Sequence, residues 1–394
     1  MRNIFIFLFA IKIYCRELVL LNAIWRHGQR TPISIVNGIY DAFPDNNLAS
    51  LLPEGMKEMA EQGLRMRQKY IYELKFLSSE YKENEIYIRS TFTRRTQNSA
   101  ECFLAGLYGS HTNGLSINNH TYISIPIFSD FFGTAYSYGD MSTCIKGVEM
   151  FTKIEKSKNA TLIIDKSSNL IEYVNKSVNS SLKNVWDFLA VYDTLKIYRE
   201  YNFSLPTWVN QTIFDELTKF NSKFLGLISG DENNDDDRIS TNRKLGGLIL
   251  KNIFDKINLT ITNLNSNVSK EQLKREQKRN NLSAVKFLGY SVHDFQVNSL
   301  LNIFGIKKAL IGDLLPNYSS VFVIELWKNE NSYEISLLYS ANSTDKLTRV
   351  TKYTNNCMNK EYCLLSAVKN EIKRYIPDDI LSECGLPNVT FKSF

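Results

Sequence analysis

The fold of this chain is decided by an apolar run and the polar loop that follows it. The run is Leu18-Val19-Leu20-Leu21-Asn22-Ala23-Ile24-Trp25, and the loop is Arg26-His27-Gly28-Gln29-Arg30-Thr31-Pro32. An apolar run of this length that ends at a glycine and a proline is typical of a buried strand entering a loop. The loop places one imidazole between two guanidiniums. Gly28 lets the backbone turn sharply and lets an anion approach it closely.

These residue types in this order favour phosphoryl transfer. Arginine is charged at any relevant pH, and its planar fork of donors fits phosphate oxygens. A neutral imidazole beside two arginines is a nucleophile that faces an electrophile whose charge is already neutralised. The alternative interpretation is a strand end with surface arginines. The sequence therefore predicts a phosphohistidine on His27, with Arg26 and Arg30 as phosphate ligands.

Two later strands are also predicted to end in polar side chains. Residues 85–91 alternate and carry Arg89, and residues 284–292 run into His293 and Asp294. Ligands of open α/β sheets bind beyond the carboxyl ends of the strands, so we expect the three loops to meet at one site. Arg89 and His293 would contact the phosphate. Asp294 would be the general acid that protonates the leaving alkoxide. This role needs the carboxyl group to be protonated, so we expect the reaction to favour acidic pH.

The order of the elements predicts an α/β fold, with a central mixed sheet flanked by helices and an inserted, mostly helical cap. We expect the α/β catalytic domain to comprise residues 17–128 and 241–394, and the cap to comprise residues 129–240. Apolar runs at 321–327 and 333–339 predict a hairpin. The acidic run 231–237 is interpreted as a surface loop at the domain boundary rather than a metal site.

Three motifs resemble those of the histidine acid phosphatases. Residues 26–32 match Arg-His-Gly-x-Arg-x-Pro, residues 88–91 with Arg95-Thr96 resemble the intermediate arginine motif, and residues 290–294 resemble the second signature. The similarity, in the manner of the prostatic and lysosomal enzymes, extends from Glu17 to Cys384. It implies a phosphoglycerate mutase-like fold and a reaction without a metal or other cofactor. The implied nucleophile is His27, the proton donor is Asp294, and the phosphate ligands are Arg26, Arg30, Arg89 and His293.

The resemblance also implies two disulfides, Cys144–Cys384 and Cys357–Cys363, which leave Cys102 without a partner, and it implies a homodimer. The sequence departs from the family pattern beside the site. Gln29 stands where aspartate is common and Phe92 where the residue is acidic. Phe295-Gln296 stands where a small hydroxyl pair usually follows His-Asp. These departures bear on substrate preference and on the pH optimum.

Several features predict a secreted or lysosomal protein. Residues 1–16 resemble a signal peptide, with Arg2 before a short apolar core. The six cysteines lack zinc-site spacing, which favours disulfides, and no later run is long enough to span a membrane. The net charge of +6 is too small and dispersed to indicate nucleic acid. Asn-x-Ser/Thr sequons occur at Asn119, Asn159, Asn175, Asn179, Asn202, Asn210, Asn258, Asn267, Asn281, Asn317, Asn342 and Asn388.

Two other functions stay open from the sequence. One is a phytase or inositol-polyphosphate phosphatase, because such enzymes share the first motif. The other is a secreted, non-catalytic glycoprotein of the same fold. The His293-Asp294 pair and the resemblance of the downstream sequence to the lysosomal enzymes favour an acid phosphatase that hydrolyses phosphate monoesters over a phytase. The presence of all six expected site residues argues against a non-catalytic protein.

Overall fold

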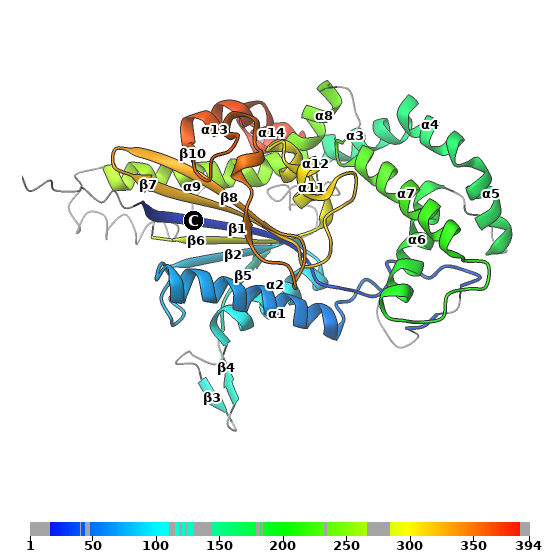
Figure 1. The fold of residues 1–394 in the computed structure, drawn as a ribbon, viewed down its shortest axis with the longest axis horizontal. Helices are drawn as coiled ribbons and strands as arrows, with labels where there is room; N and C mark the ends of the chain where they lie inside the picture. Colours follow the sequence, from blue (N-terminus) through cyan, green and yellow to red (C-terminus); the bar gives the residue numbers. More distant parts are fainter. Residues whose placement is uncertain are drawn as a thin grey trace, which may run out of the picture.

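The computed structural model describes residues 16–39, 41–43, 48–109, 115–117, 120–122, 124–129, 144–178, 182, 184–231, 235–265 and 284–386. Within these ranges eight strands form one mixed sheet with helices on both of its faces, as the sequence predicted (Figure 1). A group of helices lies beside one end of the sheet. The predicted signal peptide lies outside the described residues apart from Arg16, and so do Cys15 and the sequons at Asn119, Asn179, Asn267, Asn281 and Asn388.

The strand order explains why the first apolar run is buried. Strand β1 lies inside the sheet, parallel to β6 and antiparallel to β7. The order is β10 (Cys363–Leu364), β8 (Ser332–Ser340), β7 (Val321–Asn329), β1 (Glu17–Arg26), β6 (Phe287–Val292), β2 (Ile86–Ser90) and β5 (Ile127–Ser129), with β9 (Thr348–Arg349) also paired to β8. Strands β3 (Leu115–Ile117) and β4 (His120–Tyr122) form a separate pair. A strand covered on both faces is apolar along its whole length.

Alternate side chains of β1 belong to two different hydrophobic clusters. Leu20 and Ile24 pack with α9 (Leu248–Asn265), α11 (Asp294–Ile303) and α13 (Leu365–Ile372). Leu21 and Trp25 pack on the opposite face with α1 (Pro53–Arg67) and α2 (Arg94–Tyr108). Figure 1 shows α1 and α2 below the sheet and α9 and α13 above it. Because successive side chains of a strand point to opposite faces, this one segment contributes residues to both hydrophobic clusters.

The helices beside the sheet pack around a core of their own. They are α3 (Ile145–Glu155), α4 (Lys158–Lys166), α5 (Ser168–Ser177), α6 (Val185–Glu200) and α7 (Gln211–Ile228). Their buried side chains form one cluster, which Val36, Ile39 and Phe43 join from the loop after β1. We call α3–α7 the cap. The division of the chain into domains stays a prediction.

The acidic run is not the loop that we expected, because Asp235, Asp236 and Asp237 form the first turn of α8 (Asp235–Asn242). Carboxylates at this position interact favourably with the partial positive charge of a helix N-terminus. Residues 232–234 of the run lie outside the described residues.

Short helices complete the described structure. They are α12 (Lys307–Ile311), α14 (Ile380–Cys384), the π-helical turns η1 (Gln68–Glu73) and η5 (Arg243–Gly247), and the 3₁₀ turns η6 (Thr351–Tyr353), η7 (Asn355–Cys357) and η8 (Lys373–Tyr375). A disulfide joins Cys144, before α3, to Cys384 in α14, and a second joins Cys357 to Cys363. In the described ranges no helix is both long and apolar enough to cross a membrane.

Candidate active site

A cavity of about 680 Å³ lies between the carboxyl ends of the strands and the cap. In the sheet Arg26 pairs with Val292, and Ser90 pairs with Ser291, so β1, β6 and β2 end at the same edge. The loop after β1 and the start of α11 line one side of the cavity, and helices α6 and α7 of the cap line the other. The predicted meeting of the strand ends is therefore present, and the cap forms the opposite wall of the cavity.

His27 lies at the base of this cavity with a neutral ring. Its Nδ1 lies 2.8 Å from the carbonyl oxygen of Gly28. A carbonyl can only accept, so Nδ1 carries the proton and Nε2 holds a lone pair. Burial lowers the pKa of His27 well below its ordinary value, and the nearby charges of Arg95 and Arg26 lower it further. The imidazole therefore keeps its lone pair in mildly acidic solution.

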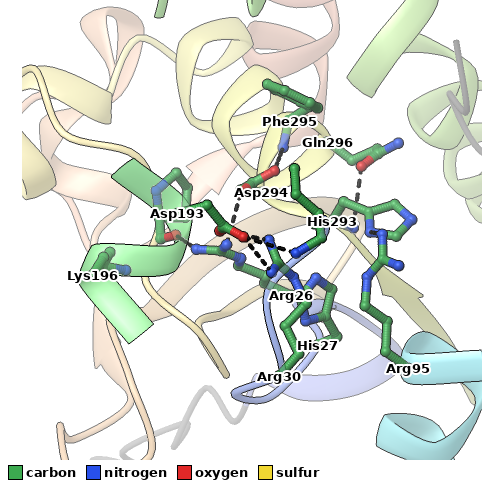
Figure 2. A network of polar contacts seen from close by, with 12 residues as sticks. Arg26, His27, Arg30, Arg95, Asp193, Lys196, His293, Asp294, Phe295 and Gln296 are labelled. Atoms are coloured by element: carbon green, nitrogen blue, oxygen red, sulfur yellow. Dashed lines mark hydrogen bonds and ion pairs between the residues drawn. The ribbon is translucent and has the colours of Figure 1, made fainter. Parts of the chain in front are cut away.

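Arg26 and Arg30 are held in place by carboxylates. Arg26 donates from Nη1 to the carbonyl oxygen of Pro316 (2.7 Å) and pairs through Nη2 with Asp294 (2.8 Å). Arg30 forms a two-bond pair with Asp193 of the cap helix α6, with both N–O distances 2.9 Å (Figure 2). Burial alone would lower the pKa of Arg30, but the carboxylate of Asp193 raises it above its ordinary value. Both guanidiniums are thus charged, and protein groups alone hold them in one orientation.

The third arginine of the cavity is Arg95, not Arg89. Arg95 lies in the first turn of α2 and lines the cavity, where burial and the charge of Arg30 lower its pKa to about 10. The structure does not bring Arg89 among the lining residues, because it lies within β2 with its guanidinium carbon 5.8 Å from the Tyr87 ring centre. A helix that begins just beyond a strand end points its first turn at the same edge. The position of Arg95 just after the predicted strand, at the start of a predicted helix, is therefore the sequence signal that could have identified it as a lining residue.

Three arginines that line the cavity each have one buried donor without a protein partner. The Nε atoms of Arg26, Arg30 and Arg95 are each buried without a hydrogen bond. Buried donors are nearly always paired in native proteins, and leaving one unpaired costs about 1–3 kcal/mol. Three such donors around one imidazole indicate a site for an anion with several oxygens.

His293 and Asp294 occupy the start of α11, at the edge of the same cavity. The His293 ring centre is 5.5 Å from that of His27. Its Nδ1 lies 3.3 Å from Arg95 Nη2, which can only donate, so Nε2 carries the proton and donates to Thr91 Oγ1 at 3.0 Å. Burial, followed by the charge of Arg95, lowers the pKa of His293 well below its ordinary value. Asp294 Oδ1 accepts the backbone N–H of Phe295, and Oδ2 binds Arg26.

The unexpected Gln296 has a local structural role. Its Oε1 accepts the backbone N–H of His293 at 3.1 Å (Figure 2). This bond satisfies a donor at the start of α11 and fixes the backbone that presents His293 and Asp294. The departure from the family pattern at Gln296 therefore preserves the geometry of the site.

Two contacts with α1 hold the loop after β1 in place, and neither could be predicted from the sequence. The backbone N–H of Gln29 donates to Glu58 Oε2 at 3.0 Å, and burial raises the pKa of Glu58 to about 7. A Cβ added to Gly28 would lie 2.2 Å from the carbonyl oxygen of Gly55 in α1. Gly28 is thus required by helix packing, whereas the sequence suggested close approach of an anion.

Tyr318 adds an aromatic face to the cluster of cations. The guanidinium carbon of Arg26 lies 4.1 Å from its ring centre, and the Lys196 ammonium of the cap lies 4.8 Å from it. The negative face of an aromatic ring attracts cations and reduces the cost of holding them together. In the described ranges no cluster of three His, Cys, Asp or Glu side chains is arranged to hold a metal ion.

Comparison with known proteins identifies the family. The chain is 26% identical to the lysosomal acid phosphatase of Xenopus laevis, covering 84% of this chain and 71% of that protein. It is 25% identical to human prostatic acid phosphatase, covering 83% and 78%. A Hafnia alvei phytase solved with myo-inositol hexakis sulphate has a TM-score of 0.64 at 15% identity, covering 94% of this chain and 99% of that one, which shows a shared fold. The family profile matches residues 17–340, and the chain belongs to branch 2 of the histidine phosphatase superfamily.

Proposed function

We propose that this protein is an acid phosphatase that hydrolyses phosphate monoesters through a phosphohistidine intermediate on His27. The observation that carries the proposal is the placement of one imidazole lone pair among three buried, unpaired guanidinium donors. Its relatives with acid phosphatase names support the same activity.

Binding would place the phosphate oxygens on these donors. Arg26, Arg30 and Arg95 supply the positive charge, with Arg95 in the place that the sequence assigned to Arg89. His293 would complete the cradle once Arg95 turns from its Nδ1 to the phosphate and Nδ1 takes up a proton, because only a protonated ring nitrogen can donate to a phosphate oxygen. Three guanidiniums neutralise the charge of the transferring group and stabilise the charge that develops on its oxygens.

The reaction then takes two steps. Nε2 of His27 forms a bond to phosphorus while the bond from phosphorus to the ester oxygen breaks, and Asp294 gives its proton to the departing alkoxide. Water next attacks the phosphorus, the N–P bond breaks, and Asp294 takes the proton from the water. The lowered pKa of His27 keeps the nucleophile unprotonated in acidic solution.

The test is release of phosphate from an aryl phosphate at about pH 5 in the presence of EDTA. Activity should survive EDTA and disappear in His27→Ala. Asp294→Asn should lose most activity toward alkyl esters, whose leaving group needs a proton, and less toward nitrophenyl phosphate. A folded wild-type protein that releases no phosphate, or a fully active His27→Ala variant, would contradict the proposal.

The same reasoning extends to location and assembly. We propose a secreted or lysosomal enzyme, because relatives are named lysosomal and prostatic and the chain carries two disulfides. Cleavage within residues 1–16 and glycosylation at sequons such as Asn159 and Asn202 are parts of this proposal. A homodimer is proposed from resemblance alone, and analytical ultracentrifugation tests it.

A further inference from the structure

The cavity is much larger than a phosphate group needs. Its volume of about 680 Å³ falls within the range of roughly 300–1,000 Å³ found for pockets that hold drug-sized ligands. The arginines and histidines occupy its base. The remaining space belongs to the alcohol part of the ester, so the walls of that space decide which alcohol fits.

Those walls are mainly apolar. Exposed large side chains are informative when they gather at one place. Four of them line this cavity although each is 41–54% exposed: Ile33, Phe92, Trp186 and Leu314. They come from four separate segments of the chain, namely the loops after β1, β2 and α12 and the start of α6. An apolar patch assembled from both the catalytic part and the cap is a surface that an apolar ligand would cover.

Another part of the wall is the edge of the cap's hydrophobic core. Phe151, Leu225 and Phe295 line the cavity and pack against that core. The rings of Phe151 and Phe295 meet edge to face, with their centres 6.5 Å apart. Figure 2 shows Phe295 beyond Asp294, on the side away from His27. The alcohol part would therefore leave the phosphate past the proton donor and enter apolar surroundings.

Few positive charges lie outside the phosphate cradle. Among the described residues that line the cavity, Lys196 is the one cation besides Arg26, Arg30 and Arg95. Its ammonium lies 3.3 Å from a carboxylate oxygen of Glu200, which neutralises part of its charge. Further phosphate groups on a substrate would lose water against Phe92, Trp186 and Leu314 without gaining partners, and burying an unpaired charge is expensive.

We propose that the cavity selects esters with a single phosphate and an extended apolar alcohol, and that Phe92 and Phe295 are specificity-determining residues. This inference rests on the proposed phosphatase function for its meaning as substrate preference. The chemistry shared by the ligands is an anionic head on an apolar body, whether that body is an alkyl chain or an aromatic ring. Both phenylalanines stand at positions where the sequence departs from the family pattern.

Alkylphosphonates test the inference by binding alone, because they have no ester bond to hydrolyse. Calorimetry would compare methyl-, butyl-, octyl- and phenylphosphonate with myo-inositol hexakisphosphate. Full burial of one methylene lowers Kd by up to about fourfold. Octylphosphonate has seven more methylenes than methylphosphonate, so half burial of each predicts that it binds roughly a hundredfold more tightly. The phenyl compound shows whether a ring or a chain fits better.

The variants separate the apolar wall from the phosphate cradle. Phe92→Ser and Phe295→Ser should each reduce the methyl-to-octyl ratio of Kd by roughly fivefold, which corresponds to about 40 Å² of lost apolar contact. Phe92 is 42% exposed, so its substitution tests the inference even if the packed Phe295 proves necessary for folding. Leu64→Ser is the matched control, because Leu64 is 55% exposed on α1 and does not line the cavity.

A Kd that does not change with chain length, or tighter binding of inositol hexakisphosphate than of octylphosphonate, would overturn the inference. Failure of the proposed function gives a different pattern. In that case the phosphonates bind with the predicted dependence on chain length, but the wild type releases no phosphate from octyl phosphate.

Discussion

Replacing Gly28 with alanine should displace the nucleophile without removing any catalytic group. The added Cβ would lie 2.2 Å from the Gly55 carbonyl oxygen and 2.7 Å from the Gly55 Cα, where ordinary contacts begin at 3.4 Å. The obstacle is backbone on the first turn of α1, so no side chain can rotate away. Either the loop or the helix must move by about 1 Å.

The size of the effect follows from that displacement. Overpacking costs about 1–3 kcal/mol, and the reduced freedom of the unfolded chain returns about 0.4–1 kcal/mol, so we expect a net loss of about 1 kcal/mol. A 1 Å misplacement at a reacting group costs about a hundredfold in rate. Because His27 is adjacent to Gly28 and its Nδ1 binds the Gly28 carbonyl, we expect kcat/KM to fall by about that factor.

Urea unfolding and kcat/KM for an aryl phosphate measure the two effects separately. Gly63→Ala is the control, because its Cβ would lie 1.9 Å from the Phe103 carbonyl oxygen at the contact of α1 with α2. It should lose stability without a comparable loss of kcat/KM in the folded protein. A Gly28→Ala variant with wild-type kcat/KM, or equal rate losses in both variants, would refute the link between this contact and the position of His27.

Three further predictions concern ionisable groups of the site. Arg95→Gln should raise the Kd for inorganic phosphate at least about tenfold and Arg89→Gln should change it little, and the reverse order would restore Arg89 as the ligand. Asp193→Asn should cost about 2 kcal/mol in urea unfolding because Arg30 loses a charged partner, whereas Glu172→Gln on the surface should have no measurable effect. Burial lowers the pKa of His27, so the unfolded chain binds a proton that the folded chain does not, and stability without phosphate should fall as pH drops below about 6.5. His27→Asn should make that pH dependence shallower, and an unchanged slope would contradict the assignment.

Local sequence patterns predicted the elements well but not all of their partners. The apolar run before Arg26 and the hairpin of β7 and β8 are present nearly where their patterns placed them. Patterns of period two and 3.6 report burial of a segment, not which segment buries it. The acidic run 235–237 was misinterpreted because carboxylates suit both a solvated loop and the first turn of a helix.

The site was predictable where residues follow strands directly. Arg26, His27 and His293 are placed by the ends of β1 and β6, and the sheet register brings them together. Arg95 was missed because its position depends on where α2 begins. Asp193 is 163 residues from Arg30 and lies on a cap helix, so nothing near either residue indicates the pair. Such contacts between distant segments exist only after the cap has packed on the sheet.

The Cys144–Cys384 disulfide has a consequence for the integrity of the molecule under proteolysis. The bond closes a covalent ring across 240 residues, which contains His293 and Asp294, while His27 lies on the chain that leads into it. A single peptide bond cleaved between residues 144 and 293 would divide the chain into two polypeptides, one with the nucleophile and one with the proton donor. The two would stay one covalent molecule until the disulfide was reduced, so a nicked enzyme would retain both halves of its site at any dilution.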